Sequence, residues 1–190
     1  MLFQLVQTVY WLALSVWFGG AMFIGVAVQV IHRTVRENNP VLPHVLSVNL
    51  EGQHSTLLGG TIVGNLIAAL ARVELACAAV LFLVMGSQWF LIDLSDTWVK
   101  ASAFVRSALF LAATATVVYD DWILWPKIVK SRQTYIDNAD DPEAANPASE
   151  RLDRLQRDSE TVLMILIFLL LGIILLSGDI RHAITFRSGD

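Results

Sequence analysis

The chain has 190 residues, of which 55% are hydrophobic and only 16% are charged. Soluble domains carry about 25% charged residues, so this composition indicates one integral membrane domain with modest loops and excludes a separate soluble domain. The formal net charge of −4 gives no support for nucleic-acid binding. The single cysteine, Cys77, excludes an intrachain disulfide and a cysteine-based zinc site.

The first apolar stretch covers residues 2–31, which include no Asp, Glu, Lys, Arg or His. As a helix it would be about 45 Å long, more than the ~30 Å hydrocarbon core of a bilayer, so it predicts the first membrane span. No basic residue precedes it and no cleavage site follows it, so we expect this helix to remain in the mature protein. Small residues spaced four apart allow another helix to approach closely. The expected packing residues of this span are Ser15, Gly19, Gly20, Ala21 and Gly25.

The second apolar stretch covers residues 55–92 and is interrupted only by Arg72 and Glu74. One helix of this length would measure about 57 Å, too long for a single span that is not strongly tilted. We therefore expect two pieces. The first, over about 55–69, has apolar and polar side chains on opposite faces, which suits an amphipathic helix at the interface or against the bundle. The second span follows over about 70–92.

The third span is expected over about 99–119, and it contains Arg106. Aromatic and charged residues over 119–127 then mark a membrane boundary. The expected packing residues of this span, again small and closely spaced, are Ala103, Ser107, Ala108 and Ala112.

Residues 131–150 are polar and acidic and include two prolines, so they predict the longest water-exposed loop. Asn146 and Pro147 have the form of an N-cap and first-turn pair. A helix is expected to continue from there, as a cytoplasmic extension, into the fourth span over about 161–178. Basic residues concentrate in the segments that join spans one to two and three to four. This distribution predicts that both segments lie in the cytoplasm and both termini on the other side of the membrane.

Three ionisable residues fall within or beside the apolar stretches: Arg72, Glu74 and Arg106. A charge at membrane depth costs about 2.5 kcal/mol or more and so requires a partner, water or a task. For Arg72 and Glu74, snorkelling at the interface, a polar cavity or ion pathway, and a protein contact all remain open. We expect Glu74 to turn toward the bundle and Arg72 to lie nearer the headgroups. Arg106 is expected near the opposite interface, so an ion pair with Glu74 is not expected.

No pattern of catalytic or metal-ligating residues appears in the chain. The histidines, which are His32, His44, His54 and His182, lie outside the expected spans, so a transmembrane haem is not expected. His32 and His54 could share a metal only if the loop between them folded back. The acidic run over 137–143 lacks the glycine and distal glutamate of a calcium loop. We therefore expect no enzyme activity, no metal site and no cofactor.

Four short motifs lie at residues 17–23, 60–72, 125–128 and 155–159. They resemble motifs of a four-helix bacterial membrane family of unknown function, related to eukaryotic transmembrane protein 205 and more loosely to CopD-type copper-resistance membrane proteins. Gln156 stands where the family usually has histidine, which removes the basis for a metal or proton role at that position. Gln29 and Val30 stand where a proline commonly ends the first helix. The resemblance implies the four-helix fold and does not imply an activity.

Together these observations predict an all-α, integral membrane four-helix bundle. The expected function is that of a non-enzymatic assembly or interaction subunit, which associates with itself or with other membrane subunits in the lipid bilayer. The alternative is a small transporter or a metal- or ion-handling protein that uses the region of Arg72 and Glu74. A redox enzyme subunit ranks third, because no histidine lies within an expected span.

Overall fold

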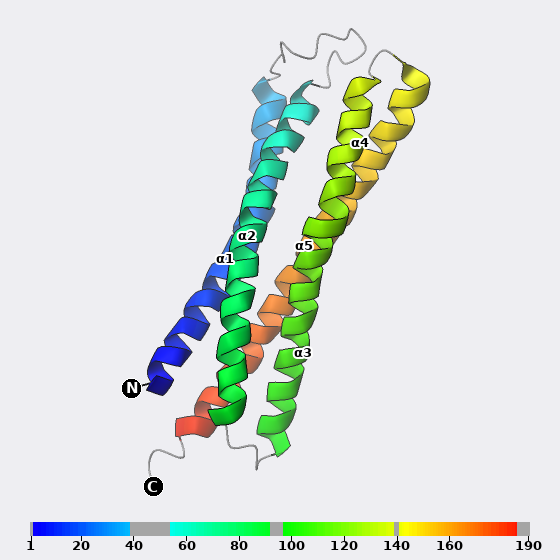
Figure 1. Cartoon of the computed structure of the whole chain (residues 1–190). Helices are drawn as coiled ribbons and strands as arrows, with labels where there is room; N and C mark the ends of the chain where they lie inside the picture. Colours follow the sequence, from blue (N-terminus) through cyan, green and yellow to red (C-terminus); the bar gives the residue numbers. More distant parts are fainter. Residues whose placement is uncertain (1, 39–53, 92–96, 139–140, 186–190) are drawn as a thin grey trace. The chain divides into compact units, whose positions relative to one another are not determined.

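The computed structural model describes residues 2–38, 54–91, 97–138 and 141–185, and everything regular within these ranges is helical (Figure 1). Four stretches are long and apolar enough to cross a membrane, which confirms the predicted all-α class with four candidate spans. The candidate spans are Gln4–Asn38, Leu58–Gln88, Thr97–Asp137 and Glu143–Gly178. The elements are α1 (Leu2–Asn38), α2 (His54–Leu91), α3 (Thr97–Tyr119), the π-helical turn η2 (Asp120–Leu124), α4 (Trp125–Asp137) and α5 (Pro142–Thr185).

The predicted break in the second apolar stretch is not found. Residues His54–Leu91 form one helix, α2, so the separate amphipathic helix over 55–69 is not confirmed. No proline lies between these residues, so nothing removes a backbone donor from the helix. At Gly60 and Gly64 of this part of α2, the side chains of Arg132 and Trp125 on α4 approach the helix backbone. A Cβ on Gly64 would overlap the ring of Trp125, at 2.7 Å from Cζ3.

The predicted loop over 131–150 is also wrong, because most of it is helical. Helix α4 continues to Asp137 and α5 begins at Pro142. The reason lies at the start of α5, where Asp141 Oδ1 accepts a hydrogen bond of 3.0 Å from the backbone N–H of Glu143. Asp141 and Pro142 thus act as the cap and first-turn pair that Asn146 and Pro147 were expected to provide.

The passage from α3 to α4 is a widened helical turn rather than a chain reversal. The N–H of Trp125 donates to the carbonyl of Asp120, five residues earlier, which is the π-helical pattern of η2. Pro126 follows directly, and a proline has no N–H and crowds the carbonyl four residues before it. Widening the preceding turn relieves that crowding and lets the helix continue.

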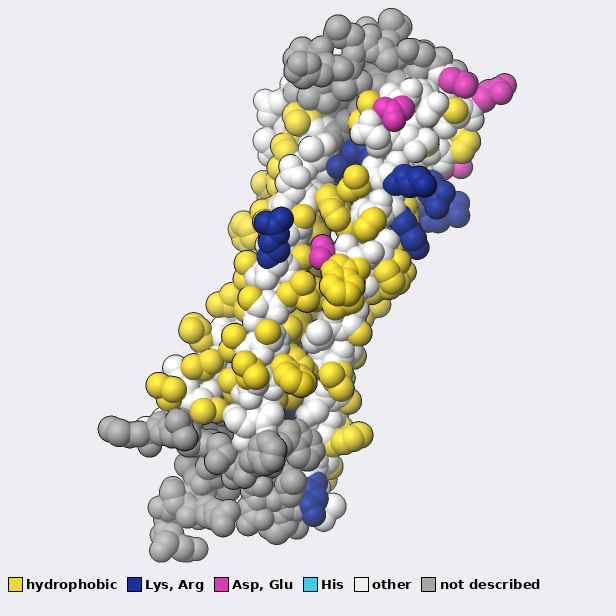
Figure 2. Space-filling model, viewed as in Figure 1, with side chains coloured by type: hydrophobic (Ala, Val, Ile, Leu, Met, Phe, Trp, Pro, Cys, Tyr) yellow, Lys and Arg dark blue, Asp and Glu magenta, His cyan; other side chains and the backbone are white. Residues whose placement is uncertain are grey.

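The chain divides into two compact units, and α1, α2, α3 and α5 contribute to both. Unit 1 comprises residues 1–21, 72–117 and 164–190. Its core is closely packed around Trp17, whose ring meets Phe110 edge-on with centroids 6.2 Å apart. Its outer surface carries large apolar side chains, as expected for helices that face lipid (Figure 2). Examples are Leu12, Phe82, Leu83, Phe104 and Phe168.

Unit 2 comprises residues 22–71 and 118–163 and has a more polar surface. Within it, Arg132 Nη2 donates to the carbonyl oxygen of Gly60 over 2.8 Å, which joins α4 to α2. Ser159 Oγ donates to Asp120 Oδ1 over 2.9 Å, which joins α5 to η2. Lys and Arg side chains gather over α4 and the start of α5 on the face shown in Figure 2.

Candidate functional site: a buried polar cluster around Arg106

The most unusual side chain in unit 1 is Arg106 on α3, which is only 2% exposed. The sequence indicated an arginine near an interface, whereas the structure places it inside the helix bundle. A cation in an apolar interior requires compensation, because removing an ion from water costs several kcal/mol. The neighbours of Arg106 show how this compensation is provided.

Arg106 is stabilised by dipoles and by an aromatic ring. Its Nη2 donates to Oε1 of Gln88, on α2, over 2.8 Å. Its guanidinium carbon lies 5.4 Å from the centroid of the Tyr10 ring, on α1, within the range of a cation–π interaction. Gln88 in turn donates through Nε2 to Oε1 of Gln7, on α1, over 3.2 Å.

The cluster continues to α5 through a pair of hydroxyl groups. Tyr10 Oη and Ser177 Oγ are 2.6 Å apart, and Ser177 Oγ also lies 2.6 Å from the carbonyl oxygen of Ile173. A carbonyl can only accept, so Ser177 donates to Ile173 and the Tyr10 hydroxyl donates to Ser177. The polar cluster, defined as Gln7, Tyr10, Gln88, Arg106 and Ser177, therefore links one residue or more from each of α1, α2, α3 and α5.

The charge of Arg106 has no carboxylate partner among the residues that the structure describes, where the only ion pair within 4.0 Å joins Arg33 and Glu37. Its Nε also makes no hydrogen bond within the described part of the chain. The cation of Arg106 is thus stabilised by neutral groups alone, namely the Gln88 amide and the Tyr10 ring. Such a network rigidifies the bundle when intact and is costly when one member is removed.

Sequence reasoning missed four of these five residues, because Gln7, Tyr10, Gln88 and Ser177 are uncharged and were read as part of their apolar runs. One feature of the sequence could have indicated the cluster. Glutamine is uncommon in a span, and Gln7 and Gln88 lie at the ends of α1 and α2 that the predicted topology places on the same side of the membrane as Arg106.

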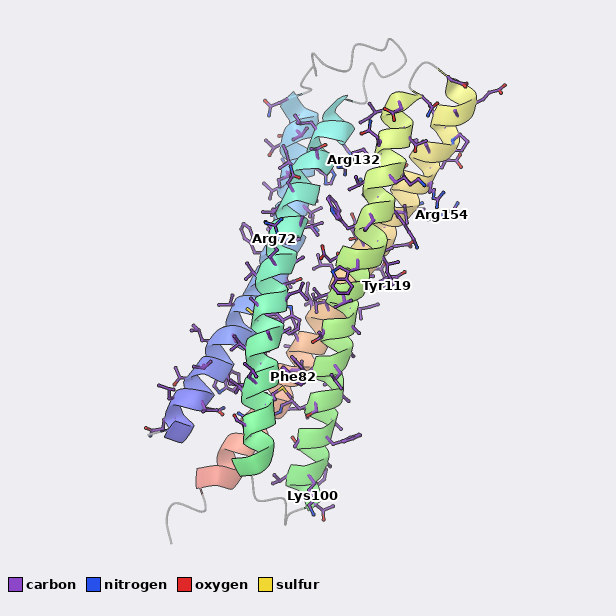
Figure 3. The ribbon with its side chains drawn as sticks, in the orientation of Figure 1. Arg72, Phe82, Lys100, Tyr119, Arg132 and Arg154 are labelled. Carbon is purple, nitrogen blue, oxygen red and sulfur yellow. The ribbon has the colours of Figure 1, made fainter. Side chains whose placement is uncertain are left out.

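The structure separates Arg72 and Glu74 from this cluster. Arg72 is exposed and is labelled in Figure 3, whereas Glu74 is 6% exposed, as its expected turn toward the bundle required. Glu74 lies fourteen residues before Gln88 on the same helix, a rise of about 21 Å. The neighbour of Glu74 one turn along α2 is Cys77, which is also buried. The expected absence of an Arg106–Glu74 pair agrees with this spacing.

The predicted packing residues fall into two groups. Ala21 and Ala103 are buried in unit 1, at 0% and 2% exposure, and so serve packing within the bundle. Ser15 and Gly19 on α1, and Ala108 and Ala112 on α3, are exposed instead. Nothing lies within 4 Å of the position that a Cβ on Gly19 would occupy. The three remaining residues are of intermediate exposure: Gly20, Gly25 and Ser107.

Among the described residues, no group of three or more His, Cys, Asp or Glu side chains could hold a metal ion. His32 lies on α1 with Nδ1 3.0 Å from the carbonyl oxygen of Val28. His44 lies outside the described residues, as do the side chains of His54 and His182. Gln156 faces α2, with Nε2 3.4 Å from the Cβ position of Gly60. No family model, curated protein or solved structure matches the chain.

Proposed function

We propose that this chain is a non-enzymatic membrane protein of a bacterial inner membrane that works by association, first of all with a second copy of itself. One observation carries the proposal. Ser15 and Gly19 have the spacing that permits close helix approach, yet the bundle leaves both exposed and leaves the space over Gly19 open. The resemblance to the four-helix membrane family remains a prediction and adds no activity.

The opposite face of α1 supports this interpretation, because it accounts for how α1 packs within its own chain. Tyr10, Leu14, Trp17 and Ala21 recur at helical spacing and are each 0% exposed. The buried face of α1 therefore packs within the bundle without Ser15 and Gly19. In lipid, where association depends on van der Waals fit, a groove of Ser15 and Gly19 is best filled by another helix.

The polar cluster supports the same proposal from inside the bundle. Arg106, Gln88 and Tyr10 are buried at 2%, 2% and 0%, so they have no open route to substrate in the described residues. Their contacts hold four helices in one register, which keeps the outer face of α1 rigid. Specific association is favoured when the exposed helix face is already rigid before binding.

The test is the oligomeric mass of the purified protein in nanodiscs, measured for the wild type and for Gly19→Leu. Gly86→Leu is the matched control, because Gly86 on α2 is also exposed and also has nothing within 4 Å of its Cβ position. We expect a wild-type dimer, loss of dimer in Gly19→Leu and no change in Gly86→Leu. A wild type that is monomeric at every lipid-to-protein ratio would contradict self-association.

A second candidate, a small ion-handling protein, is favoured by the burial of two ionisable side chains in unit 1, Glu74 at 6% and Arg106 at 2%. Proteoliposomes with a pH-sensitive dye test it. An ion flux that is present in the wild type and lost in Glu74→Gln supports this candidate. Equal leak rates for wild type, Glu74→Gln and empty liposomes reject it.

A further inference from the structure

Five exposed cations lie on two neighbouring segments of unit 2, on α4 and on the first half of α5. We call them the cation band: Lys127, Lys130, Arg151, Arg154 and Arg157. Figure 1 shows α4 and the start of α5 side by side, and Figure 2 shows Lys and Arg side chains gathered over them. Arg154 is labelled at this position in Figure 3.

The hydrogen bond between Ser159 and Asp120 defines a level from which all five cations lie on the same side, within about 15 Å. It joins α5 to the turn before α4, so Ser159 and Asp120 lie at one level. The chain leaves this level along α4 and returns to it along α5, so the residues after Asp120 on α4 and those before Ser159 on α5 lie on the same side of it. At 1.5 Å per residue, Arg157, Arg154 and Arg151 lie about 3, 8 and 12 Å beyond that level on α5. On α4, Lys127 and Lys130 lie about 10 and 15 Å beyond it.

The reference level itself carries the marks of a membrane interface. Tyr119, Trp122 and Ile123, all within three residues of Asp120, are 43%, 68% and 43% exposed. These residues follow the apolar first part of the candidate span Thr97–Asp137, and exposed tyrosine and tryptophan at the end of an apolar helix segment sit at the headgroup level. The headgroup region adds about 5–8 Å on each side of the hydrocarbon core. The cation band therefore begins in the layer that holds lipid phosphates and extends just beyond it.

These cations are available to a ligand. Carboxylates occur close by in sequence, at Glu150, Asp153 and Asp158, yet the only ion pair within 4.0 Å in the described part of the chain is Arg33–Glu37, on α1. Guanidinium groups bind phosphate oxygens in a bidentate manner, and basic side chains next to a span attract anionic lipids. The charge and the height of the band therefore match the phosphate group of an anionic lipid.

We propose that the cation band is a binding site for anionic phospholipid headgroups, on the face of the bundle formed by α4 and α5. Lys127, Arg154 and Arg157 are placed to meet the phosphodiester, and Arg151 and Lys130 to meet the outer part of the headgroup. Trp122 and Ile123 contact the lipid below its phosphate. The inference goes beyond self-association and rests only on the membrane insertion of the four spans.

The test is native mass spectrometry of the full chain in detergent, titrated with phosphatidylglycerol or with phosphatidylcholine of the same acyl chains. The variant is Lys130→Gln with Arg154→Gln. The matched control is Arg33→Gln with Arg36→Gln, which also removes two exposed cations from unit 2, but from α1. The same spectra report the dimer, so a failure of lipid selectivity and a failure of self-association are read separately.

We expect the wild type to bind phosphatidylglycerol more tightly than phosphatidylcholine, with a preference that weakens as salt rises. Each charge near the membrane surface contributes about a fivefold preference, so the band variant, which lacks two charges, should lose about twenty-five-fold and the control no more than about twofold. Lys127→Gln with Arg157→Gln is a second band variant and should show the same loss. Equal binding of the two lipids by the wild type, or an equal loss in the control, would overturn the proposal.

Discussion

Replacing Gln88 with leucine removes the oxygen that accepts the hydrogen bond from Arg106 and leaves the cation in place. Arg106 Nη2 lies 2.8 Å from that oxygen, and both side chains are 2% exposed. A hydrogen bond to a charged group contributes about 1.5–3 kcal/mol, and leaving a buried charge without its partner costs about 3–5 kcal/mol. The bond between Gln88 and Gln7 is lost as well. We expect Gln88→Leu to lower the free energy of unfolding by about 3 kcal/mol.

The double variant Gln88→Leu with Arg106→Met distinguishes a stranded charge from lost packing. Arg106→Met alone leaves the Gln88 oxygen without its donor, at a cost of about 1–3 kcal/mol. In the double variant neither the buried charge of Arg106 nor the amide of Gln88 remains, so its loss should be smaller than that of Gln88→Leu alone. Only the cation–π contact with Tyr10 and the contact with Gln7 are then missing.

Cys77 provides the assay. It is the only cysteine in the chain and is 8% exposed in unit 1, so a thiol-reactive dye reports the thermal unfolding of that unit. For a chain of this length, 1 kcal/mol corresponds to about 2–4 °C, so Gln88→Leu should lower the Tm by about 6–12 °C. The double variant should recover at least about half of that loss. A double variant whose loss equals the sum of the two single losses would refute the reasoning.

Three further predictions concern packing, charge and topology. With melting followed by circular dichroism, which reports the helices of both units, Gly64→Ala should lower the free energy of unfolding by about 1–3 kcal/mol, because its Cβ would overlap the Trp125 ring. Gly86→Ala, with open space around it, should stabilise the helix by about 0.5–1 kcal/mol. Arg72→Lys should change the Tm by less than about 2 °C, because Arg72 is exposed and a long cationic stem suffices for snorkelling, and a large loss would mean that its guanidinium has a specific partner. Asp141→Cys in a Cys77→Ser background should resist an impermeant thiol reagent in intact cells, whereas strong labelling would reverse the predicted cytoplasmic position of the segment between α4 and α5.

The fold class was predictable because it depends on local properties. Long runs without charge or proline, such as residues 2–31, identify spans without knowledge of their partners. The start of α5 was not predictable in the same way. Asp141–Pro142 and Asn146–Pro147 are both good cap and first-turn pairs, and the choice between them depends on which hydrogen bonds form.

The candidate site was only partly predictable, because its members come from distant parts of the chain. Tyr10 and Ser177 are 167 residues apart, and Arg106 and Gln88 are 18 residues apart on different helices. No local pattern indicates that Arg106 turns inward rather than toward the headgroups. For Arg72 and Glu74, by contrast, two positions on one helix necessarily face different directions, so their separation could be anticipated.

The central claim is that the outer face of α1 meets a second copy of the chain, and cross-linking in the native membrane tests it most directly. The variant is Gly19→Cys in a Cys77→Ser background, treated with a short bifunctional maleimide. The control is Phe82→Cys in the same background, because Phe82 is 64% exposed on the outer face of α2 (Figure 3). We predict a cross-linked dimer for Gly19→Cys and little for Phe82→Cys. Equal cross-linking at the two positions, or none at Gly19→Cys, would contradict the account.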